Sequence, residues 1–248
     1  MMLLVDIGNT RVKWATCTDG RLSRQESADY SSWDVAHWRD HLFAHDVNHV
    51  VAASVAGSAS REMLTQAAAA SGATVQFVAS TTQAAGIRNA YADPALLGVD
   101  RWVAVIGAHH MKRTACCVVD VGTAATIDAV DDAGRHLGGF IVPGPRLMVA
   151  SLHSGTSDLA AYSARSIPEA RTLFANNTRD AIERGCRVAL AALIDRAFYD
   201  LARLVPMQPA LLGTGGAMDE VAPYVIAPLE IVPDLVMHGL ARLAEPGA

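Results

Sequence analysis

The sequence lacks a long apolar run. Its longest clean apolar stretches, such as residues 188–194, fall far short of the roughly 20 residues that a membrane-spanning helix requires. The N-terminus has no basic region, and its apolar residues meet the acidic Asp6 almost at once, so we expect no signal peptide. We therefore expect a cytoplasmic protein that does not bind membranes.

Positive charge and paired cysteines are also scarce. The net charge is −5, the isoelectric point is near 6.0, and the only lysines are Lys13 and Lys112. Binding to nucleic acids usually needs a basic face and an isoelectric point above about 9, so we expect no nucleic-acid partner. No C-x-x-C pair occurs, and we interpret the cysteines as reduced residues that fill the core. They are Cys17, Cys116, Cys117 and Cys186.

Several widespread catalytic motifs are missing. There is no Gly-Lys dipeptide, which excludes a P-loop, and there is no H-E-x-x-H motif and no serine-centred nucleophile elbow. Residues 213–216 begin like a dinucleotide fingerprint, but Met218 stands where the third glycine belongs. His37, His41 and His45 form a stripe at helical spacing, which we interpret as a solvated helix face rather than a metal site.

What the sequence does contain is a short pattern that occurs twice. Residues 5–10 read Val-Asp-Ile-Gly-Asn-Thr, and residues 119–124 read Val-Asp-Val-Gly-Thr-Ala. In each copy a short apolar run ends in Asp-x-Gly and small polar residues, which indicates a buried strand that turns tightly into a second strand. A repeat at this separation predicts two related half-domains, residues 1–112 and 113–248.

The residue types of this repeat suit phosphate binding. Glycine lets the backbone approach a ligand closely, while Thr and Asn side chains and free N–H groups bind phosphate oxygens. An aspartate at the end of each strand can hold a cation. One copy alone would be ordinary turn chemistry more often than not. Two copies that face each other would form a cleft with a phosphate-binding loop on each wall.

Strands and helices alternate along the rest of the chain. Each half is predicted to open with a β-meander, and the pattern as a whole indicates an α/β protein. The expected strands are residues 3–7, 11–18, 22–27, 49–55, 74–78, 116–121, 123–130, 137–142, 210–213 and 229–232. The expected helices are residues 32–44, 58–71, 94–111, 178–204 and 234–244.

Residues 91–102 form a third informative segment. Asp93 and Pro94 have the pattern of a helix N-cap followed by proline in the first turn. Asp100 and Arg101 follow Gly98 and lie about 100° apart around a helix, so both can face one cleft. Two interpretations stay open: a base next to an anion anchor, or an ion pair on a surface helix.

Taken together, the motifs resemble those of the type III pantothenate kinases, in the superfamily that includes actin, hexokinase and acetate kinase. The matching segments follow the family's order over almost the whole chain. They are residues 6–13, 98–101, 120–124, 138–144, 177–178 and 214–216. The resemblance implies two related half-domains of the actin-like, ribonuclease H-like ATPase fold, with a cleft between the domains.

The resemblance also implies the reaction: ATP-dependent phosphorylation of pantothenate to 4′-phosphopantothenate, the first step of coenzyme A synthesis. Asp100 would be the catalytic base. ATP would be bound by Asp6, Ile7, Gly8, Asn9, Thr10, Arg11, Val12, Lys13 and Thr123. Pantothenate would be bound by Tyr91, Gly98, Val99, Asp100, Arg101 and Thr178.

Two cations and a dimer follow from the same resemblance. Asp120 would bind a monovalent cation, potassium or ammonium, and Asp6 would meet Mg²⁺ through the phosphates of ATP. Family members are homodimers in which pantothenate binds near the subunit interface.

Three alternatives remain at this point. Another small-molecule kinase of the superfamily would keep both loops but lack the segment at 91–101. A phosphatase of the same fold would need a carboxylate that positions water. Some relatives have been linked to gene regulation, which would make the chain a regulatory binding protein, although its acidic balance weighs against direct DNA contact.

Overall fold

The computed structural model describes residues 1–44, 46–155, 173–245 and 247. Contacts divide the chain into two compact units. The first unit comprises residues 1–113, 132–137 and 234–248, and the second comprises residues 114–131 and 138–233. The first division point lies one residue beyond the expected boundary, whereas the last segment belongs to the first unit by its contacts. The half-domains expected from the repeat, 1–112 and 113–248, stay a prediction.

The first unit is built on a mixed sheet. Its order is β3-β2-β1-β5-β6, with antiparallel pairing within the meander and parallel pairing of β1 with β5 and β5 with β6. The expected single strand at 22–27 is wrong, because two shorter strands pair with successive parts of β2. The strands are β1 (Met2–Ile7), β2 (Arg11–Thr18), β3 (Arg21–Leu22), β4 (Glu26–Asp29), β5 (His49–Ser54) and β6 (Thr74–Phe77).

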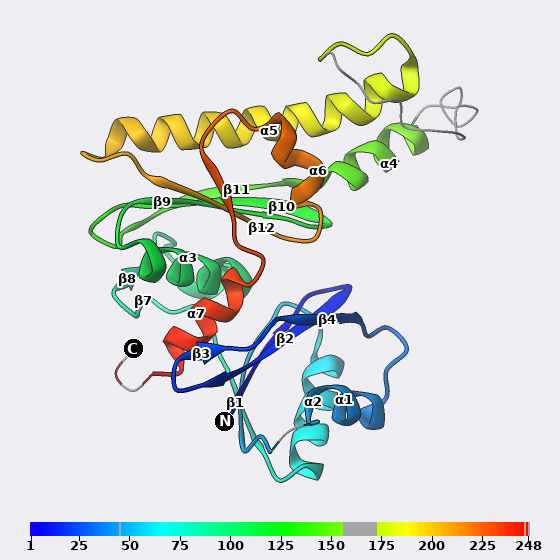
Figure 1. Ribbon diagram of the computed structural model, residues 1–248, viewed down its shortest axis with the longest axis vertical. Helices are drawn as coiled ribbons and strands as arrows, with labels where there is room; N and C mark the ends of the chain where they lie inside the picture. The colour runs from blue at the N-terminus through cyan, green and yellow to red at the C-terminus, as the bar shows by residue number, and fades with distance from the viewer. Residues whose placement is uncertain (45, 156–172, 246, 248) are drawn as a thin grey trace. The chain divides into compact units, whose positions relative to one another are not determined.

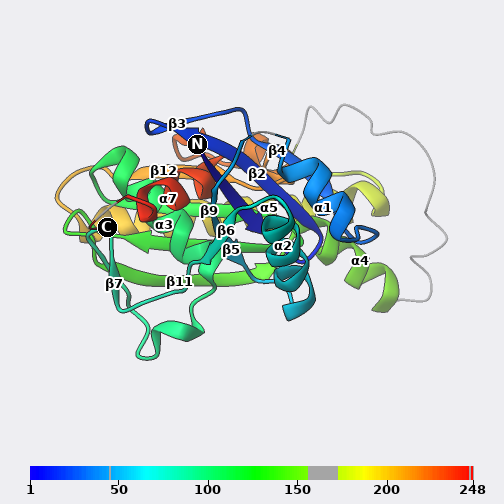
Figure 2. The same ribbon diagram turned by 90° about the horizontal axis from the view of Figure 1, so that it is seen from below.

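Two pairs of helices pack against this sheet. α1 (Val35–Leu42) and α2 (Ser58–Ala70) share a core with the β1 side chains Leu3, Val5 and Ile7. α3 (Val99–Lys112) and α7 (Leu235–Leu243) lie side by side and pack on β1 and β5 (Figure 1 and Figure 2). Since strand side chains alternate between faces, Asp6 points away from the α1–α2 core.

The second unit repeats this sheet order. Its strands run β11-β10-β9-β12-β13, again an antiparallel meander followed by two parallel strands. The predicted duplication and both predicted meanders are thus confirmed at the level of strand order. The strands are β9 (Cys116–Val121), β10 (Ala124–Val130), β11 (His136–Pro143), β12 (Ala210–Thr214) and β13 (Leu229–Ile231).

One face of the second sheet is covered by α5 (Thr178–Leu204), which has the bounds that the sequence predicts (Figure 1). Its apolar residues Leu190, Ile194 and Phe198 pack in one core with Val119 and Val121 of β9. Asp120, between these two valines, therefore points to the opposite face, as Asp6 does in the first unit. α4 (Pro145–Gly155) and α6 (Met218–Val221) complete the unit, together with the short helix η3 (Ala222–Tyr224).

Some element bounds differ from expectation for local reasons. The helix expected at 32–44 begins only at Val35, because the Asp34 carboxylate caps it by accepting the His37 N–H at 2.9 Å. The helix expected at 94–111 breaks at Gly98 into a short η1 (Pro94–Leu96) and α3. The hairpin of β7 (Gln83–Ala84) and β8 (Ile87–Arg88) and the helix α4 were not predicted.

Two expectations from composition can be checked in the described ranges. No helix there combines the length and apolar character needed to cross a bilayer. The four cysteines are buried with free thiols, as expected, and burial raises the pKa of Cys117 to about 12. His37 and His41 are exposed, which agrees with a solvated face, whereas His45 lies outside the described residues.

Candidate active site

The first Asp-x-Gly motif forms a tight turn between β1 and β2. The Gly8 N–H donates to the Arg11 carbonyl at 3.0 Å, so Asn9 and Thr10 alone form the tip, and both are exposed. The Tyr30 hydroxyl donates to the Gly8 carbonyl at 2.7 Å and supports the turn from one side. The backbone at the tip is therefore held in place while its polar side chains face solvent.

Asp6 lies one residue before the end of β1 and is only 7% exposed. Its cross-strand partner in the β1–β2 register is Lys13, whose Nζ lies 4.0 Å from Asp6 Oδ2. Because a buried carboxylate is costly without positive charge nearby, Lys13 offsets part of the cost of burying Asp6. Lys13, which the resemblance assigns to ATP binding, therefore lies beside the strand that carries Asp6.

The second motif forms the equivalent turn between β9 and β10, but it is shorter. The Gly122 N–H donates to the Ala124 carbonyl at 2.9 Å, which leaves Thr123 alone at the exposed tip. The two loops are thus related by sheet position but differ by one residue at the tip. Asp120 is half-buried and is paired in register with Thr126 and Thr214.

Two glycines pack against this second loop more closely than any other residue would allow. The Gly144 N–H donates to the Thr123 carbonyl at 2.8 Å, and a Cβ at Gly144 would lie 2.1 Å from the Gly122 oxygen. A Cβ at Gly215 would lie 2.3 Å from Asp120 Oδ1, and this residue also has a φ of +98°. Sequence reasoning included both glycines in matching segments but assigned them no contact.

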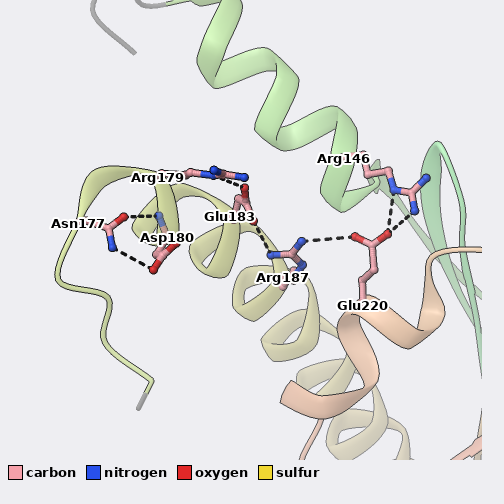
Figure 3. Close-up of polar contacts among 7 residues, drawn as sticks. All are labelled: Arg146, Asn177, Arg179, Asp180, Glu183, Arg187 and Glu220. Atoms are coloured by element: carbon pink, nitrogen blue, oxygen red, sulfur yellow. Dashed lines mark hydrogen bonds and ion pairs between the residues drawn. The ribbon is translucent and has the colours of Figure 1, made fainter. Parts of the chain in front are cut away.

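The helices that follow these glycines are joined by ion pairs (Figure 3). Glu220 of α6 binds Arg146 of α4, with 2.6 Å between Oε1 and Nη2, and approaches Arg187 of α5 at 3.7 Å. Glu183 continues the row along α5, at 3.4 Å from Arg187 and 3.1 Å from Arg179. The three helices therefore share one network of ion pairs.

The same view shows how α5 begins. The Asn177 side chain caps the helix by accepting the Asp180 N–H at 3.0 Å, and its amide donates to the Asp180 carboxylate at 2.9 Å (Figure 3). Thr178 is consequently the first residue of the helix, and its side chain is exposed.

In the first unit, Gly98 precedes α3, and the residues expected to bind pantothenate lie around the start of this helix. The Asp100 carboxylate accepts the Arg101 N–H at 2.8 Å, and a Cβ at Gly98 would lie 2.7 Å from Asp100 Oδ1. The Arg101 guanidinium, 6% exposed as a residue, instead donates to the Tyr91 hydroxyl at 3.1 Å. The Asp100 carboxylate thus binds the backbone of Arg101, whereas the Arg101 side chain binds Tyr91.

The structure brings together the predicted residues of each unit. Residues 6–13 form one turn with its flanking strands, and Tyr91, Gly98, Val99, Asp100 and Arg101 gather at the start of α3. In the second unit Asp120 and Thr123 share the short loop, while Thr178 opens α5. Among the described residues no three histidine, cysteine or acidic side chains cluster in a metal-binding arrangement.

One further residue at the start of α3 was missed by sequence reasoning. The His136 ring stacks on the Tyr91 ring, with 6.3 Å between the centroids and 19° between the planes. His136 begins β11 and is far from Tyr91 in sequence, so no local pattern pointed to it.

Solved structures share the fold. A conserved protein of Campylobacter jejuni assigned to the Baf family of transcriptional activators aligns over 97% of this chain and 96% of its own, with a TM-score of 0.60 and 22% identity. Component A of (R)-2-hydroxyglutaryl-CoA dehydratase from Acidaminococcus fermentans aligns over 98% and 95%, with a TM-score of 0.55 and 12% identity. At these identities the likeness concerns the fold alone, and it confirms the expected actin-like ATPase fold.

Sequence relatives identify the family. The family description "Type III pantothenate kinase" matches residues 2–200. The type III pantothenate kinase of Aromatoleum aromaticum is 38% identical over 100% of this chain and 99% of its own length. That of an Azoarcus species is 37% identical over 100% and 92%. By its family match and its full-length relatives, the chain belongs to the type III pantothenate kinase family.

Proposed function

We propose that this protein catalyses the ATP-dependent phosphorylation of pantothenate to 4′-phosphopantothenate, the first step of coenzyme A synthesis. The observation that carries the proposal is family membership over almost the whole chain, including both loops and residues 98–101. A different acceptor, a phosphatase and a regulatory binding protein have no support among these relatives.

Arg101 would bind the carboxylate of pantothenate. A guanidinium offers a planar pair of donors to a carboxylate, and such charge-assisted bonds are about twice as strong as neutral ones. The Tyr91 hydroxyl already accepts one Arg101 N–H, which limits the rotation of the guanidinium. Gly98 and Val99 would contact the acceptor through the backbone at the helix start, and Thr178 would contact it from α5.

Asp100 would act as the general base. Its Oδ1 accepts the Arg101 N–H, which orients the carboxylate and directs Oδ2 to take the proton of the acceptor hydroxyl. The γ-phosphoryl passes through a loose transition state in which the attacking oxygen loses its proton late, so a weak base in the correct place is sufficient. Catalysis then depends mainly on positioning and on neutralisation of charge.

ATP binding is assigned to residues 6–13 and to Thr123. Backbone N–H groups at Gly8, Asn9 and Thr10 and the Asn9 and Thr10 side chains are suited to phosphate oxygens. The Arg11 guanidinium donates to the Ser27 hydroxyl of β4 at 3.0 Å, so the Arg11 side chain lies against β4. The exposed Thr123 would contact the nucleotide from the second loop.

The donor sets at the two aspartates fit the two expected ions. Mg²⁺ takes one or two carboxylates with water and substrate phosphates, which agrees with the single buried carboxylate of Asp6. The half-buried carboxylate of Asp120, one residue before the end of β9, offers a hard oxygen ligand of the kind that a monovalent cation takes. These ions would supply positive charge beside the phosphates.

We further propose a homodimer, with pantothenate bound near its interface. Phe140 and Ile141 of β11 are 51% and 63% exposed, and Leu147 and Leu152 of α4 are exposed as well. Large apolar side chains exposed on consecutive elements are typical of a protein interface. Light scattering of the native protein and of Ile141→Glu would test this, and a native monomer would contradict it.

The cellular setting follows from the chemistry. We propose a cytoplasmic protein, which the use of ATP and the four thiols without disulfide partners support. Its net charge of −5 does not favour nucleic acid as a partner, and we propose no membrane partner.

The proposal is tested by ADP release coupled to a colour reaction, with a panel of acceptors. ADP release should require both pantothenate and Mg²⁺ and should rise with potassium. If pantothenate leaves the background ATP hydrolysis unchanged while a sugar or another carboxylate increases it, pantothenate is not the phosphoryl acceptor.

A further inference from the structure

We propose that His136 is a positioning residue for acceptor binding: its ring supports Tyr91, and Tyr91 in turn holds the Arg101 guanidinium. The inference rests on the proposed roles of Tyr91 and Arg101 and extends them to a residue outside the segments that match the family's motifs. All three residues belong to the first unit.

The contacts form a row from His136 to the guanidinium. The His136 and Tyr91 rings lie nearly parallel, 19° apart in plane, with 6.3 Å between centroids, which is within the range of stacked aromatic pairs. The Arg101 Cζ lies 5.9 Å from the centre of the Tyr91 ring, and Arg101 Nη1 donates to the Tyr91 hydroxyl at 3.1 Å. Arg101 and His136 are 6% and 3% exposed, so both ends of the row are buried.

Tyr91 itself is only half-buried, and its backbone is anchored separately. The Tyr91 N–H donates to the Asn89 side-chain oxygen at 2.9 Å, and the Asn89 amide donates to the Thr81 carbonyl at 3.2 Å. The backbone is therefore fixed without His136, whereas the ring depends on its two side-chain contacts. Removing the His136 ring frees the Tyr91 side chain without releasing its backbone.

A glycine contact brings His136 to this place. The Gly134 carbonyl accepts the Arg88 N–H at 2.8 Å, and a Cβ at Gly134 would lie 2.4 Å from the Gly86 oxygen. Arg88 and Arg135 also pair as an isolated bridge. Residues 132–137 are thereby attached to the β7–β8 hairpin, and this attachment brings the backbone of His136 close to Tyr91.

The expected consequence is weaker acceptor binding with little change in chemistry. If Tyr91 samples a second rotamer, only a fraction of the protein molecules holds the Arg101 guanidinium in the orientation that binds pantothenate. The apparent affinity for pantothenate is then reduced in proportion to that fraction. The energy of one aromatic pair corresponds to about a three- to tenfold rise in KM for pantothenate. KM for ATP should stay within about twofold, because the phosphate loops are untouched.

The test compares three variants with the native enzyme. His136→Ala removes the ring and should raise KM for pantothenate, while His136→Phe keeps a ring that can stack and should restore most of the loss. His41→Ala is the matched control, because His41 also stacks on an aromatic ring, Trp33, at 4.4 Å in the same unit. It should leave both KM values unchanged.

A further variant keeps the test decisive if His136→Ala folds poorly. His136→Leu fills most of the same space without an aromatic ring, so it should raise KM for pantothenate in the same way. Melting temperatures measured alongside separate a loss of fold from a loss of positioning.

The KM values of these variants decide whether His136 positions Tyr91. A rise in KM for pantothenate that His136→Phe restores supports the proposal. Equal changes in both KM values, a loss of kcat alone, or no rescue by phenylalanine would overturn it. If Arg101→Lys also leaves KM for pantothenate unchanged, the proposed pantothenate site itself is wrong. If Arg101→Lys raises KM for pantothenate and His136→Ala does not, only the inference about His136 fails.

Discussion

Gly215→Ala is the substitution whose effect follows most directly from the structure. The added Cβ would lie 2.3 Å from Asp120 Oδ1 and 2.4 and 2.6 Å from the backbone oxygen and nitrogen of Val121. Ordinary contacts begin at 3.4 Å, so the end of β9 must move by about 1 Å to accept the methyl group. Two of the three obstructing atoms are backbone, which has no alternative rotamer. The shift therefore reaches the loop that carries Thr123.

The size of the effect has two parts. Alanine at a φ of +98° costs about 1–3 kcal/mol, and overpacking adds a further ~1–3 kcal/mol. For a chain of this length, that sum corresponds to a fall in melting temperature of roughly 5–20 °C. A displacement of about 1 Å at a catalytic loop typically costs about 10²-fold in rate. We thus expect a folded protein of reduced stability with at most about 1% of native kcat/KM.

Thermal melting and steady-state ADP release measure both parts. Gly185→Ala in α5 is the matched control, because a Cβ there meets nothing within 4 Å. It should leave activity unchanged and raise stability by up to about 1 kcal/mol, since alanine favours the helix. If Gly215→Ala melts and turns over like Gly185→Ala, then close packing of Gly215 does not position the loop.

The remaining predictions concern single side chains. Asp100→Asn should lower kcat by about 10²–10⁴-fold, as loss of a general base does, and an unchanged kcat would leave Asp100 a structural residue. Arg101→Lys should raise KM for pantothenate chiefly, because an ammonium cannot reproduce a planar grip on a carboxylate. Asp120→Asn should abolish activation by potassium at constant ionic strength before it abolishes ATP binding; a variant still activated by potassium would remove Asp120 from the cation site. Glu220→Gln should destabilise the protein by no more than about 1 kcal/mol, because its ion pairs are partly exposed, and a larger loss in denaturant titration would contradict this.

Local signals explain what could be predicted about the fold. The long helix α5 has the predicted bounds because Asn177 caps it and its apolar pattern is unbroken. The two meanders were predictable because each strand is bounded by glycine and small polar residues. Short elements were missed, since strands as brief as β7 and β8 carry no periodic pattern.

In the candidate site, too, residues within local motifs could be predicted, whereas contacts between distant segments could not. Asp6, Asp120 and residues 98–101 could be named because each lies in a motif, and the structure places them at strand ends and a helix start. Their partners could not be named. Lys13 faces Asp6 through strand register, and Gly215 meets Asp120 through the parallel pairing of β12 with β9. Register depends on contacts between strands that no local pattern specifies.

By itself the sequence determined the duplication, the order of most strands and helices, the two Asp-x-Gly loops and the family, because these depend on residue types at short spacing. Only the tertiary structure decided that the second loop is shorter by one residue at its tip, that residues 132–137 and α7 pack in the first unit, and that His136 stacks on Tyr91. These features depend on close approach of distant backbone, as between Gly134 and Gly86. A glycine in the sequence permits such an approach, but only the folded chain shows what it meets.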